Sequence, residues 1–408
     1  MASESDMRHT DIFDTQRRNL LRLGAFGSAY GLMAPFLGGF AAARESLADN
    51  RILVVLELSG GNDGLNTVVP FRNDAYYKLR PTIGLKKNDL RMIDAEYGLN
   101  SNMAGMVKLY KDGRMAIIHG VGYPQPSFSH FNSMAYWHTA EPNSGATFGW
   151  VGRLADVLLE KNAPYPIVNV DATQSLAVRS RRHVPVVFDD PARFVPKGAP
   201  FDVSESASDA AGNTSQAFLR DVARSAKEAS VKVRDAWQNY KSPIDYGLVS
   251  LDLPKVASLI EARMPTRLYY TSFRNNAFDT HVQQGNLHSR LLTYFSDALY
   301  AFMQDMERIG RADDVMVLVF SEFGRRAAEN SNRGTDHGTA NVMFAVGKGI
   351  KGGHYGAPPD LTKLDETDNL IYTTDFRQVL ASVIEDWLKC PNAQDVLNEK
   401  FEKIGVFG

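Results

Sequence analysis

The strongest constraint on the fold is a set of short, almost wholly apolar runs that alternate with longer helical patterns along the chain. The clearest of these runs are Ile52–Leu58, Val315–Phe320 and Asn341–Gly347. Runs without polar alternation are typical of strands buried on both faces, as in a parallel sheet that helices cover. The pattern therefore predicts an α/β fold, a three-layer sandwich around a mostly parallel central sheet.

The rest of the chain fits one elaborated domain over residues 50–408, a size that can bury a substantial core. Residues 189–216 are rich in Ser, Ala, Pro, Gly and Asp without apolar periodicity, so a mobile loop or insertion is expected near residues 189–245. Further strands are predicted at residues 115–119, 165–170 and 267–273. Helical periodicity predicts helices at residues 103–110, 150–161, 217–240, 253–263, 286–309 and 374–388, and a further helix that starts within residues 127–131 and runs through residue 139.

The charge balance argues against nucleic acid as a partner, because the formal net charge is −2 and nucleic-acid binding normally needs a basic patch. The cluster of Arg179, Arg181 and Arg182 is short, and a solvated loop is its expected role. Cys390 is the single cysteine, so no intramolecular disulfide can form. Its place after an apolar helical pattern favours a structural thiol.

The N-terminus predicts the cellular compartment. Arg17 and Arg18 precede an apolar, Gly- and Ala-rich stretch that ends near Phe40, and residues 41–43 are alanines that suit a signal peptidase. A paired arginine, a weakly apolar core and small residues at the cleavage point are typical of a twin-arginine signal. We therefore expect residues 1–43 to direct export to the periplasm or beyond, with the twin-arginine translocase as a transient partner. An uncleaved membrane anchor is the alternative.

Polar loops border the predicted strands and carry residue types that suit a functional site. In a parallel sheet the carboxyl ends of all strands lie at one edge, so loops far apart in sequence can converge there. The alternative is a set of ordinary polar loops joined by a salt bridge to Arg325 or Arg326. The loops are residues 62–63, 127–130, 279–281, 321–322 and 336–337.

The side chains of these loops suit a metal centre. Carboxylate oxygens and imidazole nitrogens together bind Zn²⁺, Mn²⁺ or a similar divalent ion, and the set is large enough for two ions. Several carboxylates close together would repel one another unless a cation or a shifted pKa resolves the conflict. The candidate ligands are Asp63, Asp279, His281, His288, Glu322, Asp336 and His337.

Ser129 is the candidate nucleophile. It lies near the predicted start of a helix, where amide groups and the helix dipole favour an anion. A phosphate or sulfate ester held there would face the metal ions, which could activate the hydroxyl. The competing interpretation is that Ser127 or Ser129 only caps the helix, a very common role for serine. Arg325 is the candidate clamp for the anion.

Taken in order, these motifs resemble the family called domain of unknown function 1501, which is placed within the alkaline phosphatase/sulfatase superfamily. The motifs are residues 57–66, 129–131, 278–281, 321–325, 334–339 and 374–377. The resemblance covers nearly the whole chain after the signal, and it implies an alkaline-phosphatase-like sandwich with metal ions at the carboxyl edge of the sheet. It also implies Ser129 as the nucleophile and, as metal ligands, Asp63, Asp279, His281, Glu322 and His337.

The chain departs from the superfamily pattern in three places. Phe323 stands where the superfamily usually has a histidine, so one imidazole ligand is missing there. The spacing from Asp279 to His281 is shorter than usual, which leaves His288 as a rival ligand. No Cys-x-Pro-x-Arg or Ser-x-Pro-x-Arg signature surrounds Ser129, so formylglycine sulfatase chemistry is not expected.

Two functions follow from these features. The first is an exported metal-dependent hydrolase or transferase that acts on a small phosphate or sulfate ester. Its cofactors would be one or two divalent ions, with Zn²⁺, Mn²⁺, Mg²⁺ and Ca²⁺ as candidates. The alternative is a catalytically inactive protein that binds or assembles an envelope polysaccharide or a partner protein, which the missing imidazole favours.

Overall fold

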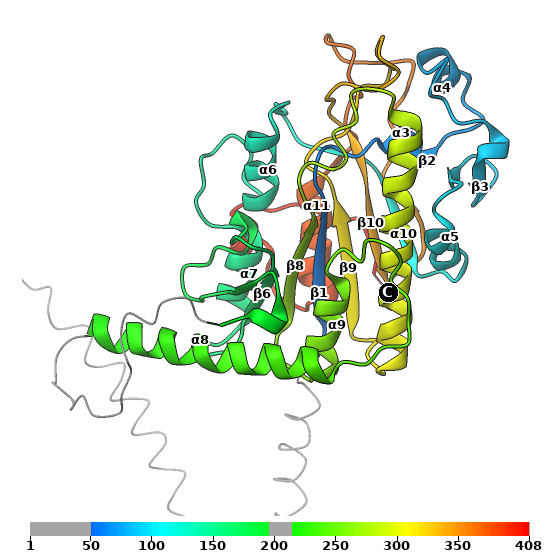
Figure 1. The fold of residues 1–408 in the computed structure, drawn as a ribbon. Coiled ribbons are helices and arrows are strands. Elements are labelled where there is room, and N and C mark those ends of the chain that lie inside the picture. The colour runs from blue at the N-terminus through cyan, green and yellow to red at the C-terminus, as the bar shows by residue number, and fades with distance from the viewer. Residues whose placement is uncertain (1–49, 196–213, 408) are drawn as a thin grey trace, which may run out of the picture. The chain divides into compact units, whose positions relative to one another are not determined.

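A mixed β-sheet forms the middle layer of the computed structural model, which describes residues 50–195 and 214–407 (Figure 1). The predicted signal at residues 1–43 and residues 196–213 of the predicted mobile loop or insertion lie outside the described residues. Along the sheet the order is β11-β5-β10-β9-β1-β8-β6-β7, and β12 pairs with β5. The strands are β1 (Ile52–Leu58), β5 (Met115–Gly122), β6 (Ile167–Val170), β7 (Val186–Phe188), β8 (Leu268–Phe273), β9 (Val315–Phe320), β10 (Asn341–Gly347), β11 (Gly353–Tyr355) and β12 (Thr374–Asp375).

Strand direction determines where the loops meet. β1 runs parallel to both of its neighbours, β8 and β9, whereas β10 runs antiparallel to β9 and β5. Because β10 is reversed, the loop that precedes it lies at the same edge as the loops that follow the parallel strands. The predicted mostly parallel sheet is confirmed, and its carboxyl edge gathers loops from far apart in the sequence.

Helices cover both faces of the sheet and confirm the three-layer prediction (Figure 1). All seven residues of β1 are buried, with Ile52, Val54 and Leu56 in one core and Leu53 and Val55 in the other. Each such side chain stabilises the fold by about 1.5–3 kcal/mol. Helices that contribute to the first core are α5 (Ala104–Lys111), α8 (Thr214–Asn239), α9 (Leu253–Glu261) and α10 (Gln284–Arg308). Helices that contribute to the second are α6 (His130–Thr139), α7 (Trp150–Leu158), α11 (Phe376–Ser382) and α12 (Gln394–Leu397).

Some elements were not predicted from the sequence. β2 (Val68–Val69), β3 (Leu90–Met92) and β4 (Gly98–Asn100) form a small antiparallel sheet between α3 (Gly64–Thr67), α4 (Asp74–Leu79) and α5. Strands of two or three residues are too short to show a hydrophobic period. The predicted helix at residues 374–388 is confirmed from Phe376 onward, because Thr374–Asp375 form β12. Its second half, Val383–Trp387, has π-helical geometry. In the described part of the chain, we find no helix that is both long and apolar enough to span a membrane.

Candidate metal centre

The glycine-rich turn after β1 brings the loops at the carboxyl edge together. The backbone amides of Gly60 and Gly61 donate to the Glu322 carboxylate at 2.8 and 3.0 Å. Both glycines have positive φ angles, 115° and 72°, which residues with a Cβ rarely adopt. A Cβ on Gly60 would lie 2.6 Å from the amide of Asp279, and one on Gly61 would lie 2.3 Å from the ring of Phe323. The turn therefore requires glycine at both positions, because a side chain at either one would clash with the neighbouring loops.

Three of the gathered residues form a compact group of potential metal ligands. The ligand atoms of His130, Asp279 and His337 all lie within 4.8 Å of one another, so this group could hold a metal ion. His130 Nε2 is 3.4 Å from Asp279 Oδ2, and His337 Nε2 is 3.1 Å from Asp279 Oδ1. His281 adds a third imidazole, with Nε2 at 2.9 Å from Asp279 Oδ1 and 3.0 Å from His337 Nε2. Asp279 is therefore surrounded by imidazole nitrogens.

His130 and His337, the two less exposed imidazoles, are each held by a hydrogen bond of the Nδ1 atom. His337 Nδ1 lies 2.7 Å from the carbonyl oxygen of Phe128, which can only accept, so this nitrogen carries the proton. His130 Nδ1 lies 2.8 Å from Glu322 Oε1 and donates to it in the same way. Each ring therefore turns its Nε2 atom toward Asp279. His130 Nε2 is buried and has no hydrogen-bond partner.

His281 repeats the arrangement at the more exposed side of the group. Its Nδ1 is 3.2 Å from Asp336 Oδ1, which also accepts from Asn330 at 3.0 Å. Asp336 thus lies behind His281, not against Asp279. Of the predicted ligands, the structure brings Asp279, His281 and His337 together. Asp336 contacts this group through the outer ring nitrogen of His281.

The electrostatics of the group favour an ionised carboxylate among neutral or positively charged rings. Burial alone would raise the pKa of Asp279, but the hydrogen bond from Arg325 and the charge of that guanidinium group lower it to about 2. Burial lowers the pKa of His337. The hydrogen bond to Glu322 raises the pKa of His130.

Arg325 is placed inside the protein, behind Asp279. Its side chain is fully buried and donates to Asp279 Oδ1 at 2.7 Å. The guanidinium also donates to the carbonyl oxygens of Gly60, Gly61, Thr335 and Phe278. A role as a direct clamp for a substrate anion would require several of these hydrogen bonds to break. The geometry instead makes Arg325 a residue that fixes the loops and the Asp279 carboxylate.

Asp63 also has a partner of its own. Both of its oxygens accept from Arg80 Nη1, at 2.7 and 2.9 Å, and the two side chains are almost completely buried. Burial would raise the pKa of Asp63, yet the charge of Arg80 and hydrogen bonds from Arg80 and Gln284 keep it below its ordinary value. Asp63 also caps the short helix α3 through the amide of Asn66. It lies outside the group around Asp279.

The rival ligand His288 is buried in the first turns of α10, away from this group. Its Nε2 is 2.9 Å from Asn62 Oδ1, and burial lowers its pKa to about 4 from an ordinary value of 6.5. Below pH 6.5 the unfolded chain binds a proton at this position that the folded protein does not bind. His288 therefore contributes stability that is present above pH 6.5 and is lost as the pH falls toward 4.

We expect His288→Gln to flatten the pH dependence of stability. The loss between pH 7 and pH 4 that is due to His288 is at most roughly 3 kcal/mol. The check is urea unfolding of wild type and variant at several pH values in that window. Wild type should lose more free energy of unfolding on acidification than the variant, and parallel curves would contradict the assignment.

Ser129 is the N-cap of α6, as the structural interpretation of the sequence expected. Its side chain accepts from the amide of Asn132 at 3.5 Å, and the residue is exposed. The capping hydrogen bond is long, and the hydroxyl remains open to solvent beside His130. Cap and nucleophile are compatible roles at this position.

His130 is the site residue that the sequence did not reveal. Its ring packs against Phe323 and His337, with centroids 4.9 and 4.5 Å away. The imidazole expected at position 323 is thus absent, and an imidazole from α6 lies against the phenylalanine that replaces it. The available signal was the place of His130 in the predicted loop at residues 127–130 and in the motif at residues 129–131.

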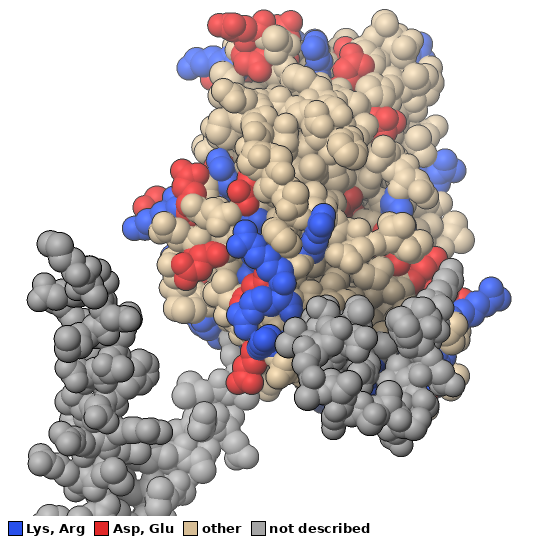
Figure 2. Space-filling view, turned by 90° about the vertical axis from the view of Figure 1, so that its left-hand side faces the viewer, with Lys and Arg blue, Asp and Glu red and all other residues tan. Residues whose placement is uncertain are grey.

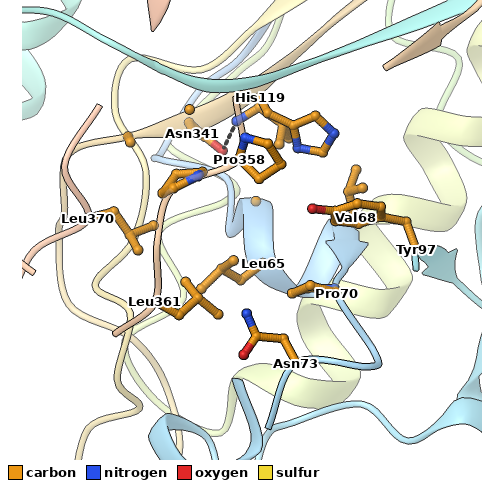
Figure 3. A pocket seen from close by; sticks show the side chains of 15 residues that line it. Leu65, Val68, Pro70, Asn73, Tyr97, His119, Asn341, Pro358, Leu361 and Leu370 are labelled. Atoms are coloured by element: carbon orange, nitrogen blue, oxygen red, sulfur yellow. Dashed lines mark hydrogen bonds between the residues drawn. The ribbon is translucent and has the colours of Figure 1, made fainter. Parts of the chain in front are cut away.

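A separate small cavity of about 80 Å³ lies between α3, the small sheet and the start of β10 (Figure 3). Its walls are mainly apolar, with Leu65, Val68 and Leu361 among them. His119 borders it, and its Nε2 atom is hydrogen-bonded to His354 Nδ1 at 2.6 Å. His354 Nε2 in turn lies 2.7 Å from Asp94 Oδ2. These histidines form a chain of polar contacts apart from the metal group.

Comparisons with known proteins found solved structures that resemble this chain at low identity. Similar solved structures include the C-terminal periplasmic domain of EptC from Escherichia coli in complex with Zn, at 9% identity over 74% of this chain and 75% of that one, with a TM-score of 0.37. The lipoteichoic acid synthase LtaP from Listeria monocytogenes matches at 12% identity over 80% and 76%, with a TM-score of 0.37. A protein in the alkaline phosphatase superfamily from Vibrio parahaemolyticus matches at 11% identity over 74% and 62%, with a TM-score of 0.36.

The similarity to these solved structures is too low to assign the site, which rests on the geometry of this chain. No curated protein matches the chain. One family model matches residues 116–384, which contain β5 except for its first residue, the strands that follow it and all the potential metal ligands around Asp279. That model describes the family DUF1501, "Protein of unknown function". The match spans more than half of the chain, which therefore belongs to the DUF1501 family.

Proposed function

We propose that this protein is a metal-dependent hydrolase or transferase of phosphate or sulfate esters. The observation that carries the proposal is the orientation of the imidazoles of His130, His281 and His337. In each ring Nδ1 faces an acceptor, so Nε2 is turned toward Asp279. Acceptors behind the ligating histidines are a regular feature of metal centres, because they fix the tautomer and the ring orientation.

A cation resolves the contacts within this group. With the proton of His337 on Nδ1, the lone pair of Nε2 faces Asp279 Oδ1 at 3.1 Å, an acceptor facing an acceptor. The unpartnered, buried Nε2 of His130 is in the same position relative to Oδ2. A divalent ion between these atoms would remove both conflicts, so the residues present fit the group that the proposal requires.

The donor set bears on the identity of the ion. Imidazole nitrogens with one carboxylate favour Zn²⁺ or another transition metal over Mg²⁺ or Ca²⁺, which prefer oxygen. The geometry supports one ion in this proposal, because Asp63, which the sequence suggested as a further ligand, is bonded to Arg80. A bound ion would polarise an ester and lower the pKa of a nearby hydroxyl or water.

Residues of this chain would supply the remaining tasks. Glu322, held by two backbone amides, orients His130, and Asp336 orients His281. Ser129 and the amides at the start of α6 would receive the anionic end of the substrate, with the serine hydroxyl as nucleophile. Arg325 would position Asp279.

Metal content is the first test of the proposal. Protein purified without chelator should contain about one equivalent of a transition metal, and Asp279→Asn and His337→Gln should each lower that content at least tenfold. Wild type should turn over aryl phosphate or aryl sulfate esters, and a chelator should abolish the activity. A metal-free protein whose properties a chelator does not change would refute the proposal.

Ser129→Asn separates the nucleophile from the cap. Asparagine caps helices as well as serine does, so the variant should keep its stability and its metal. Loss of ester turnover with metal retained supports Ser129 as the nucleophile. Full turnover by the variant would show that Ser129 caps the helix and is not the nucleophile.

The second candidate is a binding protein without catalysis, for an envelope polysaccharide or a partner protein. The observation in its favour is that Arg80 and Arg325, both buried, use their guanidinium groups within the fold. A metal-loaded wild type without activity on any phosphate or sulfate ester would favour this candidate. For either function we propose action in the periplasm or outside the cell, after passage through the twin-arginine translocase, from the pattern in residues 1–43.

A further inference from the structure

On the side of the molecule that carries α6 and α7, a loop with a cluster of arginines is held by more contacts than a solvated loop would be. Figure 2 looks onto this side and shows Lys and Arg side chains gathered near its middle, below a broad surface with few charges. Arg179, Arg181 and Arg182, which we call the arginine patch, are all exposed and follow one another in the loop between β6 and β7. None of the three forms an ion pair with a carboxylate of a described residue.

An aromatic ring holds two of these guanidinium groups. The guanidinium carbons of Arg179 and Arg181 lie 5.8 and 4.9 Å from the ring centroid of Phe148. Contact with a ring restricts the rotamers of a long side chain, so less conformational entropy is lost when the guanidinium binds an anion. The two charges are thus held near each other even though they repel.

The backbone beneath the arginine patch is fixed as well. Asp156, in the last turn of α7, accepts from the amides of Arg181 and Arg182, both at 3.0 Å, and from the hydroxyl of Ser180 at 2.6 Å. Because Asp156 bonds to the backbone, its charge does not form an ion pair with the guanidinium groups of the patch. The loop also packs closely on α7, where a Cβ on Gly152 would lie 2.2 Å from the carbonyl oxygen of Arg179.

We infer that the arginine patch binds an anionic polysaccharide that carries sulfate or phosphate groups along its chain. Guanidinium forks match sulfate and phosphate oxygens in pairs, and the two ring-held forks suit neighbouring anionic groups. Arg182 adds a third positive charge, although its Nη1 also donates to the carbonyl oxygen of Asp156 at 2.8 Å. The proposal is independent of the metal centre. It revises the expectation, made from the sequence, that this cluster is a solvated loop.

The surroundings of the patch disfavour the two other polyanions. Binding to a membrane surface normally adds exposed Trp, Phe or Leu side chains. Here the aromatic ring of Phe148 is covered by arginines, and the exposed apolar residues that follow Asp156 and the patch in sequence are the small side chains of Val157 and Val184. Single-stranded nucleic acid would need free aromatic rings for stacking, and the formal net charge of the protein is −2.

The test compares two double variants that remove the same charge. In Arg179→Gln/Arg181→Gln the patch loses its ring-held guanidinium groups. The matched control is Arg72→Gln/Arg193→Gln, since these arginines are 61% and 89% exposed and form only long ion pairs of 4.0 and 3.5 Å. Neither variant touches the metal centre, and surface changes of this kind alter stability little.

The probe is dextran sulfate, with uncharged dextran, vesicles containing phosphatidylglycerol and an oligothymidylate as comparisons. Wild type should bind dextran sulfate more tightly than the others, and the patch variant should bind it about tenfold or more weakly. Its affinity should also depend less steeply on salt, by on the order of one logarithmic unit of slope for each lost contact. The control variant should bind like wild type.

A third variant, Arg179→Lys/Arg181→Lys, keeps the charge and removes the forks. Affinity below that of wild type supports recognition by guanidinium geometry, whereas full affinity would overturn that part of the inference. Equal weakening in the patch and control variants would reduce the effect to net charge and overturn the patch as a site. Tighter binding of vesicles or oligothymidylate, or no binding of dextran sulfate, would overturn the polysaccharide assignment.

Discussion

Replacing Arg80 by methionine should destabilise the protein by about 3–5 kcal/mol, the typical cost of leaving a buried charge without its partner. Arg80 is fully buried and joins Asp63 and Asn66 to the carbonyl oxygens of Arg326 and Ala327. In the variant, Asp63 would stay in the same buried place, and burial would raise the pKa of its carboxyl. Urea unfolding near pH 7 measures the loss.

The double variant Asp63→Asn/Arg80→Met is the control for this interpretation. Asparagine can still cap α3, and no uncompensated charge remains, so the double variant should recover part of the stability that Arg80→Met loses. An additive effect of the two substitutions would show that the cost lies in packing and not in the charge pair. The metal content should change little, because neither residue belongs to the group around Asp279.

Glu322→Gln should have the second large effect, and it should act on the metal centre. The carboxylate accepts from two backbone amides and from His130. In the variant, the NH2 group of the glutamine side chain would face at least one of these donors, which it cannot accept from. We expect metal affinity to fall about 10–100-fold, as for other residues that orient a ligating histidine. The free energy of unfolding should fall by about 1–3 kcal/mol. Metal titration and urea unfolding of the metal-free protein measure the two effects.

Glu329→Gln provides the matched control. Glu329 also accepts backbone amides from a distant segment, those of Thr82 and Ile83 at 2.9 and 2.7 Å, but it does not touch an imidazole of the group. It should lower stability modestly and leave metal affinity unchanged. If both variants weakened metal binding to the same degree, Glu322 would act through general stability and not through the orientation of His130.

The sequence was sufficient for the fold because the central strands are long, apolar and separated by helices with clear periodicity. β1, β9 and β10 were predicted with their observed bounds, since a run buried on both faces admits few interpretations. The antiparallel direction of β10 could not be predicted, because a run of apolar residues looks the same in a parallel and an antiparallel strand. The small sheet was missed because its strands pack through only two or three residues each.

The site was predicted in part for a comparable reason. Loops at strand ends identified Asp279, His281 and His337 as potential ligands, which the structure brings together. No local pattern could show that Arg80 neutralises Asp63, because the pair depends on the path of the chain through α4. His130 stands in the predicted loop at residues 127–130, but it was not identified as a ligand because its carboxylate partner follows a strand far along the chain.

The central position of β1 has a consequence for how the chain is made. β1 leaves the ribosome first among the described strands, yet both of its neighbours, β8 and β9, belong to the last third or so of the chain. At about 5–20 residues per second, the wait for β8 is on the order of 10–40 s. During that time a wholly apolar strand has no native edge to pair with, so the nascent chain should depend on a chaperone that shields it until the middle of the sheet can close.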